Sequence, residues 1–393
     1  MAGTAVSRAP GLWDIDLDNF TVNLSDFPYL FWKQLGEAKS KCEHLTKAPL
    51  LPETRERINL VFLIKGIHST TAIEGNTLTE DEVMAIFKNE LTLPPSRQYQ
   101  GVEVQNILAA MNAAWKRPLP GSISNAEISA MNAEVLAGLD VAAHVTPGLY
   151  RRGTNPVAVG RYRCPDASDV SRYMDRFVEW YNGFPTTLDG LDTVSLAIIK
   201  AIAAHVYFVL IHPFGDGNGR TARLIEWRTL DHAGIASVAT HLLSNHYNLT
   251  RSRYYEMLDN ASMGRDMKPF FCYAMEGLVD QLTLQLKDIH DQYAQLVYLD
   301  MVRARTPGLG TEVIARRQEL ALAICRAKKP VTKAQLPALD PALAAHYRQT
   351  TEKTLSRDLS VLAEANLITL KADGWIAVTG SMYWRHRREM PTF

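Results

Sequence analysis

The chain has 393 residues, with 42 Lys+Arg and 42 Asp+Glu, so its formal net charge is zero. This length predicts two or three domains, at roughly 100–200 residues each. Because 47% of the residues are hydrophobic and 21% are charged, the chain can bury real cores. Wholesale disorder, a collagen-like fibre and a uniformly basic nucleic-acid coat protein are therefore excluded.

The sequence predicts a cytoplasmic protein with reduced thiols and no membrane span. Its N-terminus lacks the apolar core of a signal peptide. The longest apolar stretch, Leu196 to Ile211, contains Lys200 and His205 and is shorter than the roughly 18 apolar residues expected of a span. The cysteines are scattered without a CxxC pair, so neither a disulfide framework nor a zinc cluster is predicted. They are Cys42, Cys164, Cys272 and Cys325.

The N-terminal part of the chain reads as a series of helices. Residues 1–50 are mixed in character, and amphipathic helical patterns follow from about 53 to 145. One of them includes Ile58 to Lys65, and another starts at Thr79, which can cap the helix together with Glu82 three residues on. Residues 150–165 break the helical pattern and predict a short hairpin or loop.

Helical patterns then resume and continue to a linker. They cover 167–181, 193–211, 219–233, 251–260 and 269–303. Thr306-Pro307-Gly308-Leu309-Gly310 ends this series and predicts a linker.

The segment after the linker predicts a second kind of domain. Helices are expected over Glu312–Ala327, Val331–Leu336 and Thr351–Asn366. Two alternating strands, 367–370 and 375–378, flank the turn signal Ala372-Asp373-Gly374. Three helices followed by a two-stranded wing are similar to a winged helix-turn-helix, so the chain is expected to be mainly α with a small α+β domain at 311–393.

Residues 212–223 join two apolar helices and carry the residues best suited to phosphate chemistry. Gly215, Gly217 and Gly219 let the backbone come close to a ligand and expose its amides. The helix that follows presents free N–H groups and the positive end of its dipole, which suits phosphate. Arg220 and Arg223 lie three apart on that helix, where they can clamp polyphosphate oxygens.

Two further side chains of this segment point to group transfer. Asp216 is a carboxylate beside the predicted phosphate site, where Mg²⁺ would need one. His212, as a histidine, can titrate near neutral pH and can take a proton from an attacking hydroxyl. Together with the arginines, these residues predict transfer of a nucleotide fragment.

Plainer interpretations of the same segment exist. A glycine-rich loop alone is often only a turn, and a lone histidine before proline is often a helix-end cap. An EF-hand starting at Asp216 would need glycine and glutamate where the chain has Thr221 and Trp227. There is no GxxxxGK[ST] pattern, so no P-loop is predicted.

His212 to Arg223 matches the Fic signature HxFx[DE]GNGRxxR at every specified position, and the chain therefore resembles the Fic/Doc family. The resemblance implies a helical Fic core with a short β-hairpin flap. It also implies AMPylation, in which AMP moves from ATP to a Ser, Thr or Tyr hydroxyl of a target protein. The Doc branch, which phosphorylates, carries lysine where this chain has Gly219.

The resemblance also implies a role for each signature residue. His212 would be the general base and Asp216 would hold Mg²⁺ between the α- and β-phosphates. Asn218 and the amides around the three glycines would cradle the phosphates, and Arg220 and Arg223 would bind the β/γ end. Outside the signature, Tyr255 would lie on the nucleoside side. The flap, including Val157, Gly160 and Tyr162, would pair with the target's backbone as an added strand.

Residues 70–76 match the family's inhibitory pattern [ST]xxxE[GN], which starts at Thr70 and places its glutamate at Glu74. By resemblance, Glu74 would reach Arg223 in a bidentate pair and exclude the γ-phosphate from its productive position. The plainer interpretation is an ordinary Glu-Gly helix end with an exposed acid. The same glutamate could instead orient a water that removes AMP from a target.

The expected domains are an N-terminal helical region with the inhibitory motif at 1–110, a Fic core at 111–305 and the winged domain at 311–393. Residues 311–393 carry 13 Lys+Arg and 8 Asp+Glu, so the zero net charge combines a basic C-terminal part with an acidic remainder. Arg348, Lys353 and Arg357 lie on or near the third helix, and Arg385 to Arg388 form a basic tail. A winged helix with this charge could insert its third helix into the major groove of DNA. A protein-binding or dimerisation module is the alternative.

The sequence is compatible with several functions. The leading hypothesis is AMP transfer to a target protein or to the chain itself. A de-AMPylase would use the same residues, and an ATP-sensing DNA-binding regulator would not need the base His212. The expected substrate is ATP with Mg²⁺, and the expected partners are a target protein, DNA through 311–393, and a second copy in a homodimer.

Overall fold

The computed structural model describes residues 17, 26–47, 52–116, 121–153, 156–188, 190–306, 311–348 and 350–378. The chain divides into two compact units, residues 1–285 and residues 286–393. The predicted linker residues 307–310 and the basic tail at 385–388 lie outside the described residues. The expected boundary between residues 110 and 111 stays a prediction.

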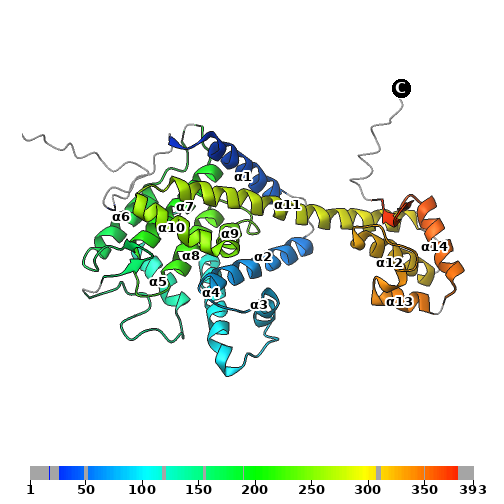
Figure 1. Cartoon of the computed structure of the whole chain (residues 1–393), viewed down its shortest axis with the longest axis horizontal. Helices are drawn as coiled ribbons and strands as arrows, with labels where there is room; N and C mark the ends of the chain where they lie inside the picture. Colours follow the sequence, from blue (N-terminus) through cyan, green and yellow to red (C-terminus); the bar gives the residue numbers. More distant parts are fainter. Residues whose placement is uncertain are drawn as a thin grey trace, which may run out of the picture. The chain divides into compact units, whose positions relative to one another are not determined.

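The first unit is a bundle of helices with one small hairpin (Figure 1). In chain order its elements are α1 (Tyr29–Lys47), α2 (Pro52–Ile73), α3 (Glu80–Phe87), a 3₁₀ turn (Pro95–Arg97), α4 (Gln98–Lys116), α5 (Asn125–Val135), β1 (Ala158–Val159), β2 (Tyr162–Arg163), α6 (Val170–Gly183), α7 (Thr193–Ile211), α8 (Asn218–His232), α9 (Leu242–Leu249), α10 (Arg251–Gly264) and the start of α11 (Lys268–Arg305). The mainly helical fold with a short hairpin is confirmed.

Helix α7 forms the core of this unit. The Asp192 carboxylate caps its start by accepting hydrogen bonds from the N–H groups of Val194 and Ser195, at 2.9 and 3.1 Å. From Ser195 to Ile211 every residue except Lys200 is buried, against α8, α6 and α1. By length and composition alone α7 could cross a membrane, contrary to our expectation, but 89% of its apolar window is buried within the protein, as in a core helix.

Local signals placed most of the helices correctly. The capping box at the start of α3 is present, because Thr79 and Glu82 each bond the other's backbone N–H, at 3.2 and 2.9 Å. The helices expected at 167–181, 193–211, 219–233, 251–260 and 269–303 correspond to α6, α7, α8, α10 and α11. Helices α1 and α9 were not expected, because their apolar residues carry no clear start signal.

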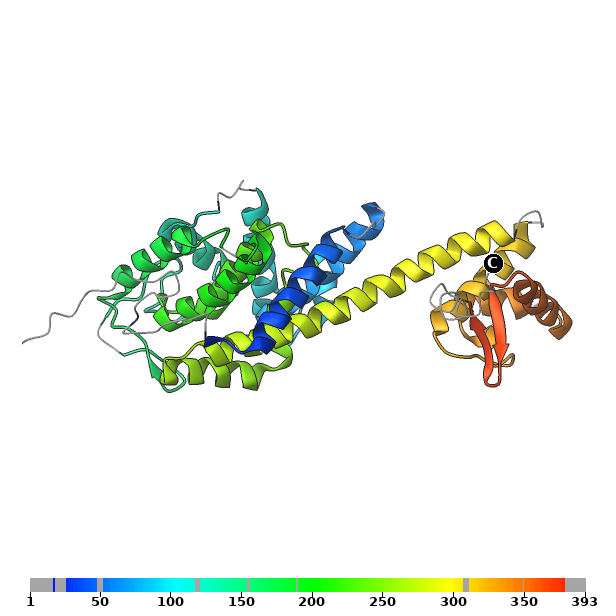
Figure 2. The same ribbon diagram turned by 90° about the horizontal axis from the view of Figure 1, so that it is seen from above.

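The second unit contains α12 (Thr311–Ala327), a 3₁₀ turn (Leu336–Ala338), α13 (Pro341–Arg348), α14 (Glu352–Glu364), β3 (Ile368–Lys371) and β4 (Gly374–Ala377). The two strands are antiparallel, with Ile368 opposite Ala377, and Figure 2 shows them beside α14. The elements follow in the expected order, and their assignment as a winged helix-turn-helix stays a prediction.

The second helix of this unit lies later than expected. The prediction of a helix over Val331–Leu336 is wrong, because Val331 pairs with Trp375 of β4 through two backbone hydrogen bonds of 2.9 and 2.8 Å. Val331 and Thr332 are β-branched, and such residues favour extended backbone over helix. The helix forms instead at α13, which begins with Pro341, a residue suited to the first helical turn.

Candidate active site

His212 lies where α7 ends. Its backbone is left-handed, with φ 49° and ψ 58°, and the following Pro213 prevents the helix from continuing. Arg151 fixes this unusual conformation by donating from Nε to the carbonyl of His212 at 2.8 Å. The backbone of Arg151 also bonds the Pro213 carbonyl at 2.8 Å, and its guanidinium bonds the Pro165 carbonyl. One arginine therefore joins the end of α7 to both sides of the flap segment.

Asn218 holds the glycine-rich loop in shape. Its side-chain oxygen accepts from the Phe214 N–H, and its side-chain nitrogen donates to the Phe214 carbonyl, both at 2.9 Å. The side chain of Asn218 thus bonds the loop backbone, and its expected role in cradling the phosphates stays a prediction. Gly217, with φ 75°, starts α8 in a conformation that glycine adopts without strain.

A second asparagine supports the loop from α5. The fully buried Asn132 donates from Nδ2 to the carbonyl of Asp216 at 3.0 Å, and its Oδ1 accepts from the Gly148 N–H at 3.0 Å. Gly217 packs so closely that an added Cβ would lie 2.9 Å from this amide nitrogen. Neither Asn132 nor Arg151 belongs to the signature, so their supporting role could not be read from that motif.

Arg223 is almost fully buried and bonds the inhibitory segment. Its Nε donates to the Thr70 hydroxyl at 2.8 Å, and its Nη2 donates to the Thr70 carbonyl at 3.0 Å and to Glu74 Oε1 at 2.6 Å. The expected contact between Glu74 and Arg223 is therefore present, although only one carboxylate oxygen is bonded rather than two. Thr70 supplies the remaining contacts of the guanidinium.

The Glu74 carboxylate lies over the first turn of α8. A Cβ added to Gly219 would come within 2.6 Å of Glu74 Oε1, so only glycine leaves room for it there. A helix N-terminus favours negative charge, and this is the place where a phosphate would bind. Burial alone would raise the pKa of Glu74, but the charge and hydrogen bond of Arg223 outweigh it and lower this pKa. Glu74 therefore stays ionised and occupies an anion site.

Arg220 has different partners from Arg223. Its Nη1 donates to Glu103 Oε1 on α4 at 3.0 Å, while its Nη2 lies 3.5 Å from Asp216 Oδ1. Glu103 also accepts a hydrogen bond of 2.9 Å from Asn76. Glu103 escaped the sequence analysis because a single glutamate in a helix carries no local signal.

His212 is held in its neutral form. Burial is the largest cause that lowers the pKa of His212 to about 4; the charge of Arg151 acts in the same direction, while the backbone of Val209 and the carboxylates of Glu74 and Asp216 partly oppose this shift. Both acids are thus close enough to act on the imidazole. A neutral imidazole can accept a proton at physiological pH, as a general base must.

The flap hairpin pairs Ala158 with Arg163 and Val159 with Tyr162. Its base is closed by a hydrogen bond of 2.9 Å from the Cys164 N–H to the Val157 carbonyl. Its turn contains Gly160, with φ 59°, and is held by α10, where Asp259 accepts from the Arg161 backbone N–H at 2.8 Å and from its guanidinium. Residues 154 and 155 lie outside the described part of the flap.

Tyr255 lies on α10 beside the end of the inhibitory helix. Its hydroxyl donates to the Ile73 carbonyl at 3.3 Å, and its side chain is partly exposed. Arg251 lies 6.0 Å from the Tyr255 ring and also lowers the pKa of Glu74. The structure thus places Tyr255 next to the inhibitory segment.

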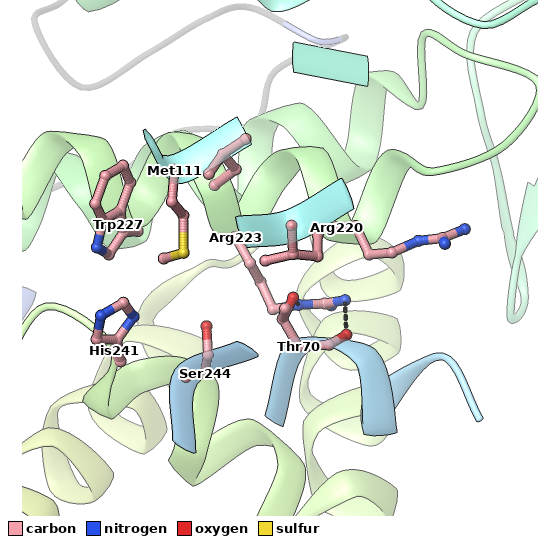
Figure 3. Close-up of a pocket in the computed structure, with 10 residues that line it drawn as sticks. Thr70, Met111, Arg220, Arg223, Trp227, His241 and Ser244 are labelled. Atoms are coloured by element: carbon pink, nitrogen blue, oxygen red, sulfur yellow. Dashed lines mark hydrogen bonds between the residues drawn. The ribbon is translucent and has the colours of Figure 1, made fainter. Parts of the chain in front are cut away.

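A small cavity of about 20 Å³ lies beside the arginine pair (Figure 3). Figure 3 shows Thr70 and Arg223 facing each other, with Trp227, His241 and Ser244 on the neighbouring walls. This volume suits about one water molecule and not a nucleotide. The anion site at the start of α8, where Glu74 lies, is therefore the better place for polyphosphate.

The described residues contain no group of three or more His, Cys, Asp or Glu side chains that could hold a metal ion alone. Asp216 is half-exposed, and its Oδ1 accepts from the Gly217 N–H at 2.5 Å. One carboxylate fits Mg²⁺ that is held mainly by substrate phosphates, because this ion usually keeps few protein ligands at nucleotide sites. It does not fit an independent metal centre.

The fold and the site define a helical protein with a two-arginine anion clamp beside a neutral histidine. Residues 122–230 match the family model "Fic/DOC family", so this part of the chain is similar to that family. "Protein adenylyltransferase fic-1" of Caenorhabditis elegans is 32% identical over 211 residues, which are 53% of this chain and 38% of that protein. "Protein adenylyltransferase Fic" of Drosophila ananassae is 30% identical and covers 59% of this chain and 44% of its own length.

Solved structures agree on the fold. A Fic family protein from Desulfovibrio desulfuricans G20 superposes with a TM-score of 0.56 at 21% identity, covering 89% of this chain and 92% of that one. A fragment of Fic-1 from Caenorhabditis elegans gives a TM-score of 0.54 at 24% identity, covering 67% of this chain and 74% of the fragment. The chain spans about two-fifths of the length of the curated relatives it matches.

Proposed function

We propose that this protein transfers AMP from ATP to a hydroxyl group of a target protein and that Glu74 restrains the reaction. The observation that carries the proposal is the Glu74 carboxylate, held by Arg223 at 2.6 Å over the first turn of α8. An anionic side chain occupies the site where the signature would bind phosphate. The names of the relatives, which are adenylyltransferases, support the same activity.

The reaction needs a base, a polyphosphate clamp and a displaced leaving group. His212 takes the proton of the attacking hydroxyl, whose oxygen forms a new bond to the α-phosphorus of ATP. The bond between the α-phosphorus and the bridging oxygen breaks, and pyrophosphate leaves with that oxygen. Arg220, Arg223 and the amides at the start of α8 stabilise the charge that develops on it.

Asp216 would hold Mg²⁺ together with the phosphates of ATP, and the ion would neutralise part of the phosphate charge. The flap would align the target by pairing with its backbone, in the manner of an added strand. Arg151 and Asp259 support this role. Arg151 joins His212 to Pro165 at the end of the flap, and Asp259 holds the turn of the flap through Arg161.

Glu74 would act as a brake by competing with phosphate. A buried guanidinium can bond either a carboxylate or a phosphate with the same donors, and Arg223 already uses Nε and Nη2 on Thr70 and Glu74. Removing Glu74 frees one N–H group of Nη2 and the helix terminus for the γ-phosphate, while the contacts of Nε and Nη2 with Thr70 keep the guanidinium in place.

The test incubates the full chain with ATP carrying a tag on the α-phosphate, followed by intact-mass analysis. We expect Glu74→Gly to increase self-labelling at least tenfold over wild type, and His212→Ala to abolish it in the Glu74→Gly background. Glu90→Gly is the matched control, because Glu90 is an exposed glutamate of the same unit without a contact to the arginines. It should label like wild type.

Four outcomes would count against the proposal in different ways. Unchanged labelling of Glu74→Gly at saturating Mg-ATP would reject the brake. Labelling from ATP tagged only at the γ-phosphate would mean phosphate transfer. Binding of ATP without any transfer would favour the ATP-sensing alternative, and release of AMP from a pre-labelled target by wild type alone would favour de-AMPylation.

A further inference from the structure

Glu103 and Arg220 form a buried ion pair beside the phosphate clamp. Glu103 Oε1 accepts from Arg220 Nη1 at 3.0 Å, and the side chains are 14% and 6% exposed. The second oxygen, Oε2, accepts from Asn76 Nδ2 at 2.9 Å. Both oxygens of Glu103 are therefore bonded, and the carboxylate is fixed from two sides.

Asn76 is itself firmly placed. Its Nδ2 also donates to the Gln100 carbonyl of α4 at 3.0 Å, and its Oδ1 accepts from the Leu78 N–H at 3.0 Å. Asn76 is 7% exposed and lies two residues after Glu74. The segment that carries the brake is thus fastened to α4 by a contact that does not involve Glu74.

The two glutamates hold the two arginines in different ways. Glu74 lies over Gly219 at the start of α8, in the position that suits phosphate. Glu103 projects from α4 and takes only Nη1 of Arg220, so Nη2 remains directed at Asp216, 3.5 Å away. Glu74 therefore occupies the anion site, whereas Glu103 bonds only Nη1 of Arg220 and leaves Nη2 of that arginine available.

We propose that Glu103, supported by Asn76, is a positioning residue that holds Arg220 in the orientation that binds the polyphosphate. An arginine side chain has many rotamers, and fixing one end of its planar guanidinium removes much of that freedom before the ligand arrives. Arg220 can then meet a phosphate without first finding its orientation. This inference rests on the proposed nucleotide site, and it separates Glu103 from the brake.

The test uses the full chain in the Glu74→Gly background, where the brake is absent. Calorimetry with Mg-ATP gives Kd, and labelling from α-tagged ATP gives KM and kcat. We expect Glu103→Gln to raise both Kd and KM for ATP about tenfold, the effect of weakening one charge-assisted contact. The kcat at saturating ATP should stay unchanged, because the contacts of Glu103 with Asn76 and Arg220 involve neither His212 nor the flap.

Two further variants separate positioning from general damage to the fold. Asn76→Ala should raise Kd in the same direction, and the double variant should be less than additive, since both changes act through one contact to Arg220. Glu82→Gln is the matched control, because it weakens the ion pair of Glu82 with Arg97, 2.9 Å, without touching either signature arginine. Thermal melting checks each variant, and Glu103→Asp replaces Glu103→Gln if the latter does not fold.

The outcomes are distinguishable from failure of the proposed function. Tighter ATP binding by Glu103→Gln would make Glu103 a second competitor of phosphate and overturn the inference, as would an unchanged Kd. Absence of AMP transfer in the Glu74→Gly parent would count against the proposed function, while the calorimetric Kd would still decide the role of Glu103.

Discussion

The chemistry proposed for this protein depends on the protonation state of one imidazole. Burial lowers the pKa of His212 to about 4, so the free protein holds it neutral well below the ordinary pKa of about 6.5. Glu74 opposes this shift, and its removal in Glu74→Gly should therefore lower the pKa rather than raise it.

We expect kcat/KM of Glu74→Gly to stay level as the pH falls from 7 to about 5 and to decline only toward pH 4. Protonated His212 cannot accept a proton, so activity is lost as the pH drops through its pKa in the free enzyme. The measurement is the rate of α-tagged labelling at low ATP across this range, with circular dichroism at each pH as the control for folding. A decline of kcat/KM centred near pH 6.5 would contradict the lowered pKa and would show that the His212 imidazole is not desolvated.

At the residue scale, contiguous signals were predictable and distant supports were not. The signature residues occupy one loop and one helical turn, so their proximity follows from spacing alone. Arg151, Asn132 and Glu103 bond residues of the same site across 61, 84 and 117 positions of the chain. Only folding brings them there.

At the scale of elements, caps and periodicity were the informative signals. Helix α7 begins where Asp192 caps it and ends at His212, as its apolar run predicts. Val331 was misassigned because its partner, Trp375, lies far along the chain. A strand pairing that is decided by a distant segment leaves little trace in the local sequence.

Asp358 is a buried carboxylate on α14 that bonds side chains of α12 and α13. It accepts from Arg316 and Arg317 of α12 at 2.8 and 2.7 Å and from the Tyr347 hydroxyl of α13 at 3.0 Å. Burial alone would raise the pKa of Asp358, but these hydrogen bonds outweigh it and lower this pKa. Its stabilisation is therefore complete above the unfolded value of about 3.9 and is lost as the pH falls through the folded pKa.

We expect Asp358→Ala to destabilise the second unit by about 3 kcal/mol, because two arginines lose a buried partner. Tyr347→Phe, which removes one hydrogen bond, should cost about 1 kcal/mol. Hydrogen exchange of the α12 and α14 amides at pH 7 and pH 3 measures both effects within this unit. The loss of protection between pH 7 and pH 3 should be smaller in Asp358→Ala than in the native chain. Equal protection of the two proteins at pH 7 would contradict a stabilising role of Asp358.

At the scale of the whole molecule, the zero net charge hides an uneven distribution. Residues 311–393 carry 13 Lys+Arg and 8 Asp+Glu, whereas the chain as a whole carries 42 of each. On α14 the buried residues include Leu355, Leu359 and Leu362, while Lys353 and Arg357 are exposed. The two basic side chains thus lie on the exposed face of this helix, which is the surface that the DNA prediction concerns.

We predict salt-sensitive binding of the full chain to random duplex DNA, measured by fluorescence anisotropy at several salt concentrations. Replacing Lys353 and Arg357 together by glutamine should weaken binding and reduce the slope of log K against log salt by roughly 2, since each lost phosphate contact removes about one counterion. Replacing the exposed Lys33 and Lys88 of the first unit is the charge-matched control and should leave the slope unchanged. Absence of binding by the native chain at low salt would reject the DNA contact and leave the protein-binding or dimerisation module as the alternative.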